Sequence, residues 1–222
     1  MGYFKTEMSG DTLVVRLANP PYNALNSDML EALAQHFEAV GEDPPAGGVV
    51  LTGEGDNFTR GMDVKVAATF DEAGAARARH AINIFFASLH RLPCALVGAV
   101  GGHSIGAGGI AMLCCDWVVA AQGDYRIGLP EAKAGLPFPT VAQAVLDHWL
   151  DPVWRRRLAL TSQLIGPDEA VNAGLADELV PADTLLSRAV EMAQAMNAQA
   201  GFAACKRQLR ARANAEIDAL LA

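Results

Sequence analysis

Residues 1–17 contain no long apolar run behind a basic start. We therefore expect neither a membrane span nor a signal peptide, and we expect a cytoplasmic location. Basic residues are also in the minority, since 17 Lys and Arg stand against 25 Asp and Glu, for a net charge of -8. Nucleic acid is not expected as a partner, because a phosphate-binding surface needs concentrated Lys and Arg.

Cysteine is scarce, and its spacing excludes two classes of site. The four cysteines form no CxxC pair and have no histidine nearby at metal-ligand spacing; they are Cys94, Cys114, Cys115 and Cys205. We expect no metal and no disulfide framework, but reduced and mostly buried thiols. The glycine-rich stretch 101–116 fits neither GxGxxG nor GxxxxGK[ST] and contains no lysine. A bound nucleotide cofactor is therefore not expected.

What the sequence does contain predicts an α/β fold. Hydrophobic residues make up 51% of the 222 residues and charged residues 19%, as in a globular protein with a sizeable core. Four Val- and Leu-rich runs predict buried strands at 12–17, 48–53, 94–100 and 117–121. Amphipathic helices are expected between them, the first capped by Asn26 or Ser27. Helices alone are expected after residue 140, so we divide the chain into a core, 1–140, and a helical region, 141–222.

Two glycine-containing turns follow predicted strands and should open at the same edge of the sheet. The stretch 101–116 leads from a strand into a helix, where free backbone N–H groups and the helix dipole favour negative charge. The stretch 53–65 offers a second such turn. Two turns of this kind can converge on one oxygen and stabilise an oxyanion that develops during a reaction. The alternative interpretation is structural: the glycines only allow the helix to pack closely on a strand.

Five segments together resemble the crotonase, or enoyl-CoA hydratase/isomerase, superfamily, and they occur in the family's order. They are LANPPYNALN (17–26), VVLTGEGDNFTRGMDVK (49–65), GGHSIGAGGIAMLCCD (101–116), YRIGLPEAKAGLPF (125–138) and LTSQLIGPDEAVNAGLADELVP (160–181). The resemblance implies a crotonase-like spiral of stacked ββα units with a helical C-terminal trimerisation region. It also implies a homotrimer or dimer of trimers that binds an acyl-CoA thioester, with coenzyme A as part of the substrate. The oxyanion hole is then expected on the backbone N–H groups of Arg60 and Ala107.

The chemistry depends on one glutamate that is present and one that is absent. Hydratases of the family use two glutamates, and Ile110 stands at the position of the first. Glu131 matches the second and is the expected catalytic base. A single carboxylate can take a proton from C2 of a 3-enoyl thioester and return it to C4, so the pattern favours the Δ3,Δ2-enoyl-CoA isomerase branch. Burial near Ile110, Leu136 and Phe138 should raise the pKa of Glu131. A surface pairing of Glu131 with Arg126 or Lys133 is the alternative.

Further residues are expected to bind substrate, and for some of them a structural role is an alternative interpretation. The set is Ala24, Phe58, Gly61, Met62, Asp63, Lys65, Gly108, Ile110, Leu136 and Phe138. The side chains of Arg60 and Lys65 reach either a phosphate of coenzyme A or solvent. Asp63 fits a structural role in its loop better than a catalytic one, and His103 fits a packed position.

Two other functions stay open from the sequence. One is different crotonase-type chemistry, such as hydration, thioester hydrolysis or decarboxylation. The other is an acyl-CoA-binding subunit without turnover, which the departures at Ile110 and Arg60 and a C-terminal end that comes early for the family would fit. Acyl chain length, the choice between trimer and hexamer, and the pathway are not determined by these motifs.

Overall fold

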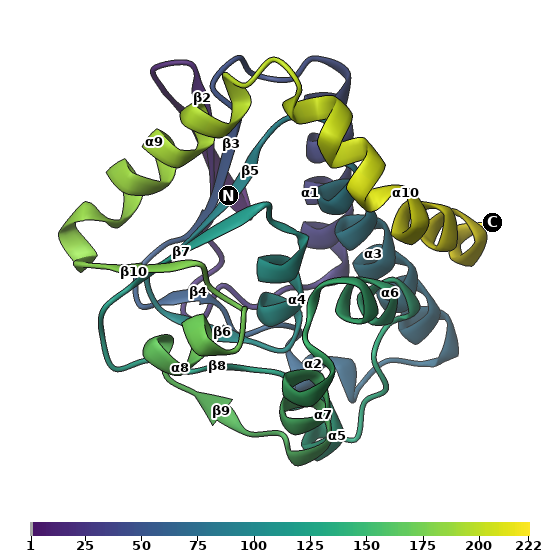
Figure 1. The fold of residues 1–222 in the computed structure, drawn as a ribbon. Helices are drawn as coiled ribbons and strands as arrows, with labels where there is room; N and C mark the ends of the chain where they lie inside the picture. The colour runs from purple at the N-terminus through teal and green to yellow at the C-terminus, as the bar shows by residue number, and fades with distance from the viewer. Residues whose placement is uncertain (1) are drawn as a thin grey trace.

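A six-stranded sheet runs through the centre of the fold in the computed structural model, which describes residues 2–222 apart from the side chains of Val64 and Lys65 (Figure 1). Its order is β1-β2-β3-β5-β7-β10, and all neighbours are parallel except β1 and β2. The strands are β1 (Phe4–Ser9), β2 (Thr12–Leu17), β3 (Val49–Gly53), β5 (Leu96–Val100), β7 (Trp117–Ala121) and β10 (Glu178–Val180). The four strands predicted from Val and Leu runs are all present in this sheet.

A second, four-stranded sheet has the order β4-β6-β8-β9. Its strands are β4 (Asn57–Thr59), β6 (His103–Ile105), β8 (Ile127–Gly128) and β9 (Leu164–Ile165). Each of β4, β6 and β8 follows a strand of the first sheet and precedes a helix, so the chain repeats a strand, strand, helix unit three times. This repetition confirms the predicted spiral of ββα units.

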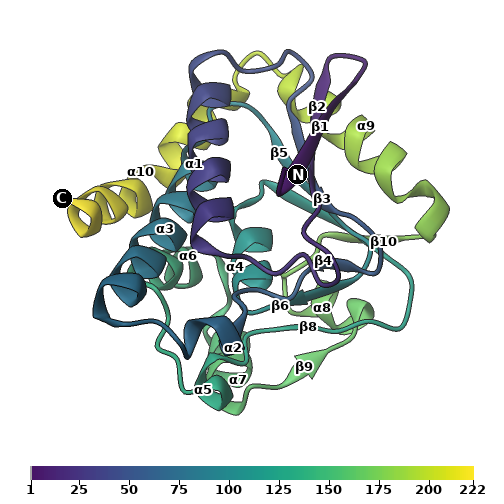
Figure 2. The same cartoon turned by 180° about the vertical axis from the view of Figure 1, so that it is seen from behind.

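Helices cover both faces of the six-stranded sheet (Figures 1 and 2). Alternate strand residues face opposite sides: Val15 and Leu51 join the main core with α1 (Ser27–Glu42), α3 (Glu72–Arg91) and α4 (Ala107–Cys114). Val14 and Val50 instead pack with α9 (Leu185–Asn197). Because side chains along a strand alternate with a period of two, each buried strand contributes to two separate cores.

The C-terminal region is mainly helical, as predicted, but it also completes both sheets. Its other helices are α6 (Thr140–Trp149), α7 (Pro152–Thr161), α8 (Pro167–Asn172) and α10 (Phe202–Leu221), with a short 3₁₀ helix η1 (Ala182–Thr184). The prediction that strands stop after residue 140 is wrong, because β9 pairs with β8 and β10 with β7. Strands of two or three residues are too short to show an alternating pattern. None of the helices in residues 2–222 has the length and apolar character needed to cross a bilayer.

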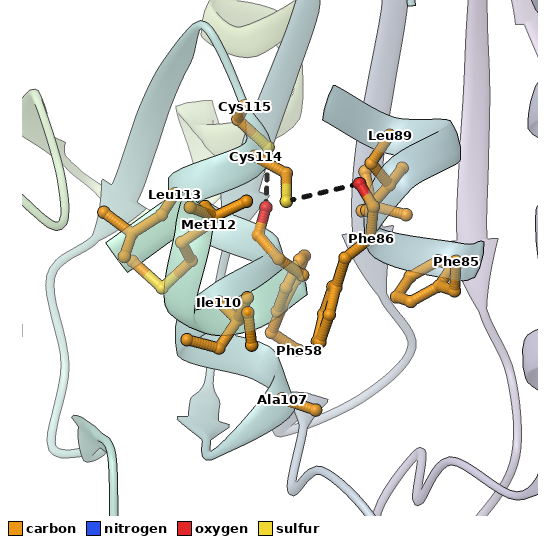
Figure 3. Packing of buried hydrophobic residues seen from close by; sticks show 14 of the residues in the cluster. Phe58, Phe85, Phe86, Leu89, Ala107, Ile110, Met112, Leu113, Cys114 and Cys115 are labelled. Atoms are coloured by element: carbon orange, nitrogen blue, oxygen red, sulfur yellow. Dashed lines mark hydrogen bonds between the residues drawn. The ribbon is translucent and has the colours of Figure 1, made fainter. Parts of the chain in front are cut away.

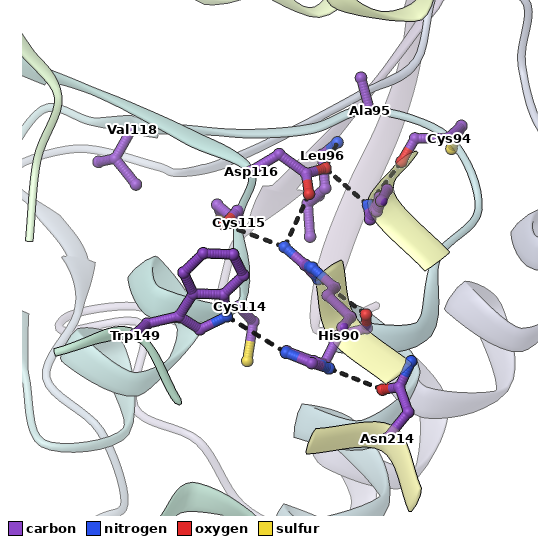
Figure 4. Close-up of polar contacts among 12 residues, drawn as sticks. His90, Cys94, Ala95, Leu96, Cys114, Cys115, Asp116, Val118, Trp149 and Asn214 are labelled. Carbon is purple, nitrogen blue, oxygen red and sulfur yellow. Dashed lines mark hydrogen bonds and ion pairs between the residues drawn. The ribbon is translucent and has the colours of Figure 1, made fainter. Parts of the chain in front are cut away.

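A buried ion cluster fastens α10 to the core (Figure 4). The Asp116 carboxylate binds Lys206 Nζ at 2.6 Å and Arg210 at 2.7 Å, and it accepts a third hydrogen bond from Leu96 N–H at 2.8 Å. Lys206 also donates to the Cys94 carbonyl at 2.7 Å. The side chains of the three ionic residues are at most 8% exposed. Every charge in the cluster therefore has a partner, which a buried charge requires.

His90 extends this cluster as a neutral side chain. Its Nδ1 contacts Asn214 Oδ1 at 2.8 Å, and its Nε2 accepts from Trp149 Nε1 at 3.2 Å (Figure 4). Burial and the neighbouring Arg210 lower the pKa of His90 to about 3. The arrangement fixes the tautomer with hydrogen on Nδ1, so the contact with α10 does not change charge near neutral pH.

Candidate active site

The helix α4 begins with backbone amides that have no protein acceptor. It follows β6 through Gly106, whose φ of 58° and ψ of -114° favour glycine strongly, and no side chain caps its start. Within the part of the chain that the structure describes, Gly106 N–H donates to Gly128 O at 2.8 Å, but Ala107 N–H and Gly108 N–H donate to no protein atom. The positive end of this buried helix is thus left open to a negatively charged group.

The turn at Gly61 lies directly against this helix start, as the shared sheet edge predicts. Gly61 has a φ of +75°, and a Cβ at this position would lie 2.7 Å from Ile105 O and 3.2 Å from Ala107 N. Any side chain would therefore separate the two turns. The parallel pairing of β4 with β6 delivers both turns to this contact.

Only one of the three amides in this turn is free to bind an oxygen. Arg60 N–H donates to Tyr22 O at 3.2 Å, and Gly61 N–H donates to Thr59 Oγ1 at 3.0 Å. Among the hydrogen bonds of residues 2–222, Met62 N–H has no protein acceptor. The prediction that Arg60 N–H serves this site is therefore wrong, because that amide is already used by the loop before α1. Met62 N–H is the available donor beside Ala107.

The Arg60 side chain is fixed at the same turn. Its Nε donates to Asn57 Oδ1 at 2.8 Å, and its guanidinium carbon lies 4.6 Å from the centre of the Tyr22 ring. Stacking of this kind holds an arginine in place although it is exposed. In this structure the side chain therefore supports the turn.

Glu131 reaches the same point from a third segment. It is the first residue of the short helix α5 (Glu131–Ala134), which follows β8 and is held at its other end by Lys133 N–H donating to Ser162 Oγ at 3.0 Å. Glu131 Oε1 lies 3.1 Å from the position that a Cβ on Gly106 would occupy. A side chain at position 106 would displace the carboxylate. Glu131, the Gly61 turn and the start of α4 thus surround one small region.

The Glu131 carboxyl group is largely buried, and its hydrogen bonds satisfy it only in part. Its Oε2 is inaccessible to solvent and has no hydrogen-bond partner within residues 2–222. Burial raises the pKa of Glu131 from 4.5 to about 7, and its own backbone amide offsets only part of that rise. The predicted direction of the shift is confirmed. The alternative of a surface pair with Arg126 is contradicted, because Arg126 instead binds Asp124 at 2.8 Å.

Two residues predicted to bind substrate belong to the core instead. Phe58 and Ile110 are each 1% exposed and pack in the main cluster with Phe86 (Figure 3). Their side chains pack behind the turn and the helix. Ile110 nevertheless fixes one property of the site, since its position carries an apolar side chain where a carboxylate would be needed for a two-glutamate mechanism.

Gly108, in the first turn of α4, has a packing role in addition to its free amide. A Cβ on it would lie 2.8 Å from Ser104 Oγ and 2.9 Å from Thr59 O. The absence of a side chain therefore lets α4 lie close to the two strands that carry the turns.

Three other predicted residues line a small pocket next to the Gly61 turn. The pocket has a volume of about 130 Å³ and is lined by Asn19, Ala24, Leu25, Asn26, Met62, Asp63, Val66 and Phe70. Ala24, Met62 and Asp63 are therefore brought together, as expected of substrate-binding residues. The Ala24 carbonyl already accepts from Asn19 Nδ2 at 2.6 Å.

Leu136, Phe138 and His103 lie nearer the surface. Leu136 is 40% exposed and Phe138 is half-buried against the main core. The side chain of Lys65 lies outside the described residues. His103 is partly buried, and its Nδ1 accepts from Arg126 N–H at 3.1 Å, which agrees with a packed position.

Comparison with known proteins relates both the sequence and the fold to one family. The sequence profile of the enoyl-CoA hydratase/isomerase family matches residues 7–221. Mouse mitochondrial enoyl-CoA delta isomerase 1 is 29% identical over 83% of this chain and 65% of its own length, slightly under two thirds. The 2,3-dehydroadipyl-CoA hydratase of Escherichia coli is 30% identical over 90% of this chain and 78% of its own length.

Solved structures show the same fold over nearly the whole chain. An enoyl-CoA hydratase from Mycobacterium ulcerans superimposes with a TM-score of 0.90 and 27% identity, covering 99% of this chain and 96% of the other. Human mitochondrial delta3-delta2-enoyl-CoA isomerase gives a TM-score of 0.89 at 23% identity, covering 99% and 90%, and supports the fold alone. Profile, relatives and fold agree, and the chain belongs to the enoyl-CoA hydratase/isomerase family.

Proposed function

We propose that this chain is an acyl-CoA isomerase that moves a double bond from C3 to C2. The observation that carries this proposal is the largely buried Glu131 carboxyl group, whose Oε2 has no partner in residues 2–222, beside the free backbone amides of Ala107 and Met62. Relatives with isomerase names and relatives with hydratase names are similarly close, so the choice between the two reactions depends on the site residues.

The first half of the reaction is removal of a proton from C2 by the ionised Glu131 carboxylate. The electrons left behind move onto the thioester oxygen, which becomes an enolate oxygen. Ala107 N–H and Met62 N–H would donate to this oxygen, and the open N-terminus of α4 adds its positive dipole end. Free amides that need no rearrangement are suited to a charge that exists only during the reaction.

The second half returns the same proton to C4, which shifts the double bond to C2 and restores the carboxylate. A group that both takes and returns a proton is most efficient when its pKa lies near the working pH. A pKa of about 7 for Glu131 meets that condition. Isomerisation needs no water and no second acid.

Position 110 favours isomerisation over hydration. The family resemblance implies that hydratases hold and activate water with a second glutamate there, and this chain has Ile110 packed into the core. An isoleucine offers no hydrogen bond to water. Hydration is the second candidate reaction, and binding of acyl-CoA without turnover is the third candidate function.

A homotrimer or dimer of trimers is part of the same proposal. Four large apolar side chains are exposed on α5, α7, β9 and the residues between them: Leu136, Val153, Leu160 and Leu164 are exposed at 40%, 46%, 73% and 42%. Figures 1 and 2 show these elements side by side at one end of the molecule. A group of exposed apolar side chains supports a contact between subunits.

The test is a substrate panel on purified protein, with Glu131→Gln measured in parallel. We expect 3-hexenoyl-CoA to give 2-hexenoyl-CoA of unchanged mass, with the activity lost in the variant. A gain of one water by 2-hexenoyl-CoA would support hydration, and release of free coenzyme A would support hydrolysis. Tight binding of coenzyme A esters without turnover, unchanged in Glu131→Gln, would contradict any catalytic role.

A further inference from the structure

The turn that carries Met62 N–H is fixed by a loop distant in sequence. Asn23 is 2% exposed and has a positive φ of 50°, and its Nδ2 donates to Asn57 O at 2.7 Å and Glu54 O at 3.0 Å. Its Oδ1 accepts from Asn19 N–H at 3.1 Å. One buried amide side chain therefore ties the loop before α1 to the turn after β3.

Thr59 makes the connection from this loop to the turn itself. Its hydroxyl donates to Asn23 O at 2.6 Å and accepts from Gly61 N–H at 3.0 Å. Thr59 is 1% exposed, so solvent does not replace either bond if the hydroxyl is removed. A hydroxyl is one of the few side-chain groups that can donate and accept at once in so little space.

The two peptide groups around Gly61 are consequently held from two sides. On one side, Thr59 Oγ1 accepts from the Gly61 N–H, which belongs to the peptide group before the Gly61 Cα. On the other side, the Gly61 carbonyl accepts from Leu25 N–H at 2.9 Å. The Met62 N–H lies in the same planar peptide group as that carbonyl and points in the opposite direction. Gly61 itself has the broad conformational freedom of glycine, so these contacts decide where Met62 N–H points.

We propose that Thr59 is a positioning residue: its hydroxyl holds the Gly61 turn so that Met62 N–H and Ala107 N–H meet at one substrate oxygen. This inference rests on the proposed function, because it requires a thioester oxygen between the two amides. Thr59 acts through Met62 and does not itself touch the substrate.

The experiment compares Thr59→Val, which keeps the shape but loses the hydroxyl, with Thr59→Ser, which restores it. Thr52→Val is the matched control, because Thr52 is also a buried threonine that donates to a carbonyl, Ala99 O at 2.8 Å, away from the turn. The main readout is the infrared stretch of the thioester carbonyl in bound hexanoyl-CoA labelled with ¹³C at C1. The second readout is kcat and KM with 3-hexenoyl-CoA.

We expect wild type, Thr59→Ser and Thr52→Val to shift the carbonyl stretch to lower frequency, and Thr59→Val to lose most of that shift. We also expect kcat to fall roughly 10- to 100-fold in Thr59→Val with KM changed less than about threefold, as for a small misplacement of a reacting group. If Thr59→Val does not fold, Thr59→Ala carries the same expectation.

The outcomes separate the two proposals. A full carbonyl shift and full kcat in folded Thr59→Val would overturn the role of Thr59 and leave the isomerase proposal standing. A carbonyl shift that depends on Thr59, in a protein that does not isomerise 3-hexenoyl-CoA, would support the positioning role and overturn the isomerase proposal. No shift in wild type would overturn both amide assignments.

Discussion

Two carboxyl groups of this protein are buried in opposite ways. Asp116 is bound by Lys206, Arg210 and a backbone amide, and Glu131 has an Oε2 without any partner in residues 2–222. A buried carboxylate with two cations is a structural element, since it joins α10 to the core. A buried carboxyl group without a cation is destabilising when ionised, and such groups concentrate at functional sites because their proton can be exchanged near neutral pH.

The different environments of Asp116 and Glu131 follow from their positions at opposite ends of α4. Asp116 comes after the C-terminal end of α4, where the carbonyl of Cys115 also accepts from Arg210 at 3.2 Å. Glu131 lies near the N-terminal end of the same helix, beside Gly106. Cations lie at the negative end of α4, and the carboxyl group that we propose as the base lies at its positive end, where the developing enolate is also expected.

The largest effect is expected from Glu131→Gln. Removing the proposed proton-transferring group should lower kcat for 3-hexenoyl-CoA by about 1000-fold, within the range for general acid–base catalysis. The fold should persist, because glutamine is similar in size and carries no charge. Circular dichroism measures whether the fold persists, and steady-state kinetics measure the loss of kcat. The matched control is Glu216→Gln, at an exposed glutamate. Activity within a few-fold of wild type would place the base elsewhere.

The next effect is on stability and comes from Asp116→Asn. This change leaves Lys206 and Arg210 buried without their counter-charge, which typically costs about 3–5 kcal/mol. We expect the urea midpoint to fall accordingly while kcat per folded molecule stays near wild type. A variant with unchanged stability would show that the cluster does not hold α10, and one that is stable but inactive would connect the cluster to catalysis.

A third effect is the pH dependence of the stability that Glu131 contributes. The pKa of Glu131 is raised from 4.5 to about 7 in the folded protein, so the folded state binds this proton more tightly than the unfolded state. Its contribution to the free energy of unfolding is full below pH 4.5 and is lost as the pH rises through 7. The loss amounts to about 3 kcal/mol. Urea unfolding of wild type and Glu131→Gln at pH 5, 6, 7 and 8 should show a difference that changes over this window. Parallel curves would contradict the shift.

The smallest effect is expected from an exposed ion pair that joins α3 to α10. Arg91 binds Asp218 of α10 at the surface, where the two side chains are 39% and 69% exposed. Asp218→Asn should cost under about 1 kcal/mol and should matter less as salt is added. Comparing it with Asp116→Asn isolates burial as the cause. Equal losses in the two variants would mean that burial does not decide the value of these pairs.

Much of this arrangement was predictable because it is local in sequence. Asn26 caps α1 by accepting from Met29 N–H at 2.9 Å, and the two glycine turns lie after strands that the Val and Leu runs predict. Glu131 was identified by the family motif that contains it. The identity of the free amide was not predictable from the motif. It depends on Tyr22 accepting from Arg60 N–H and on Thr59 accepting from Gly61 N–H, which only the folded loop shows.

The partners of Asp116 were also beyond reach of the sequence. Lys206 and Arg210 lie 90 and 94 residues away along the chain, on α10, which carries several other charged residues. Two cationic residues on a helix that carries many charged residues do not indicate, from the sequence alone, that their side chains are buried. The short strands β9 and β10 were missed for a related reason, since their pairing partners and not their own residues define them.

The most direct test is the pH dependence of kcat/KM for isomerisation of 3-hexenoyl-CoA by wild-type protein. An unpaired, buried Glu131 that must be ionised to take the C2 proton predicts a rate that falls tenfold per pH unit below about pH 7. A rate that stays level down to pH 5 would contradict the account, because the reacting group would then have the ordinary pKa of an exposed glutamate.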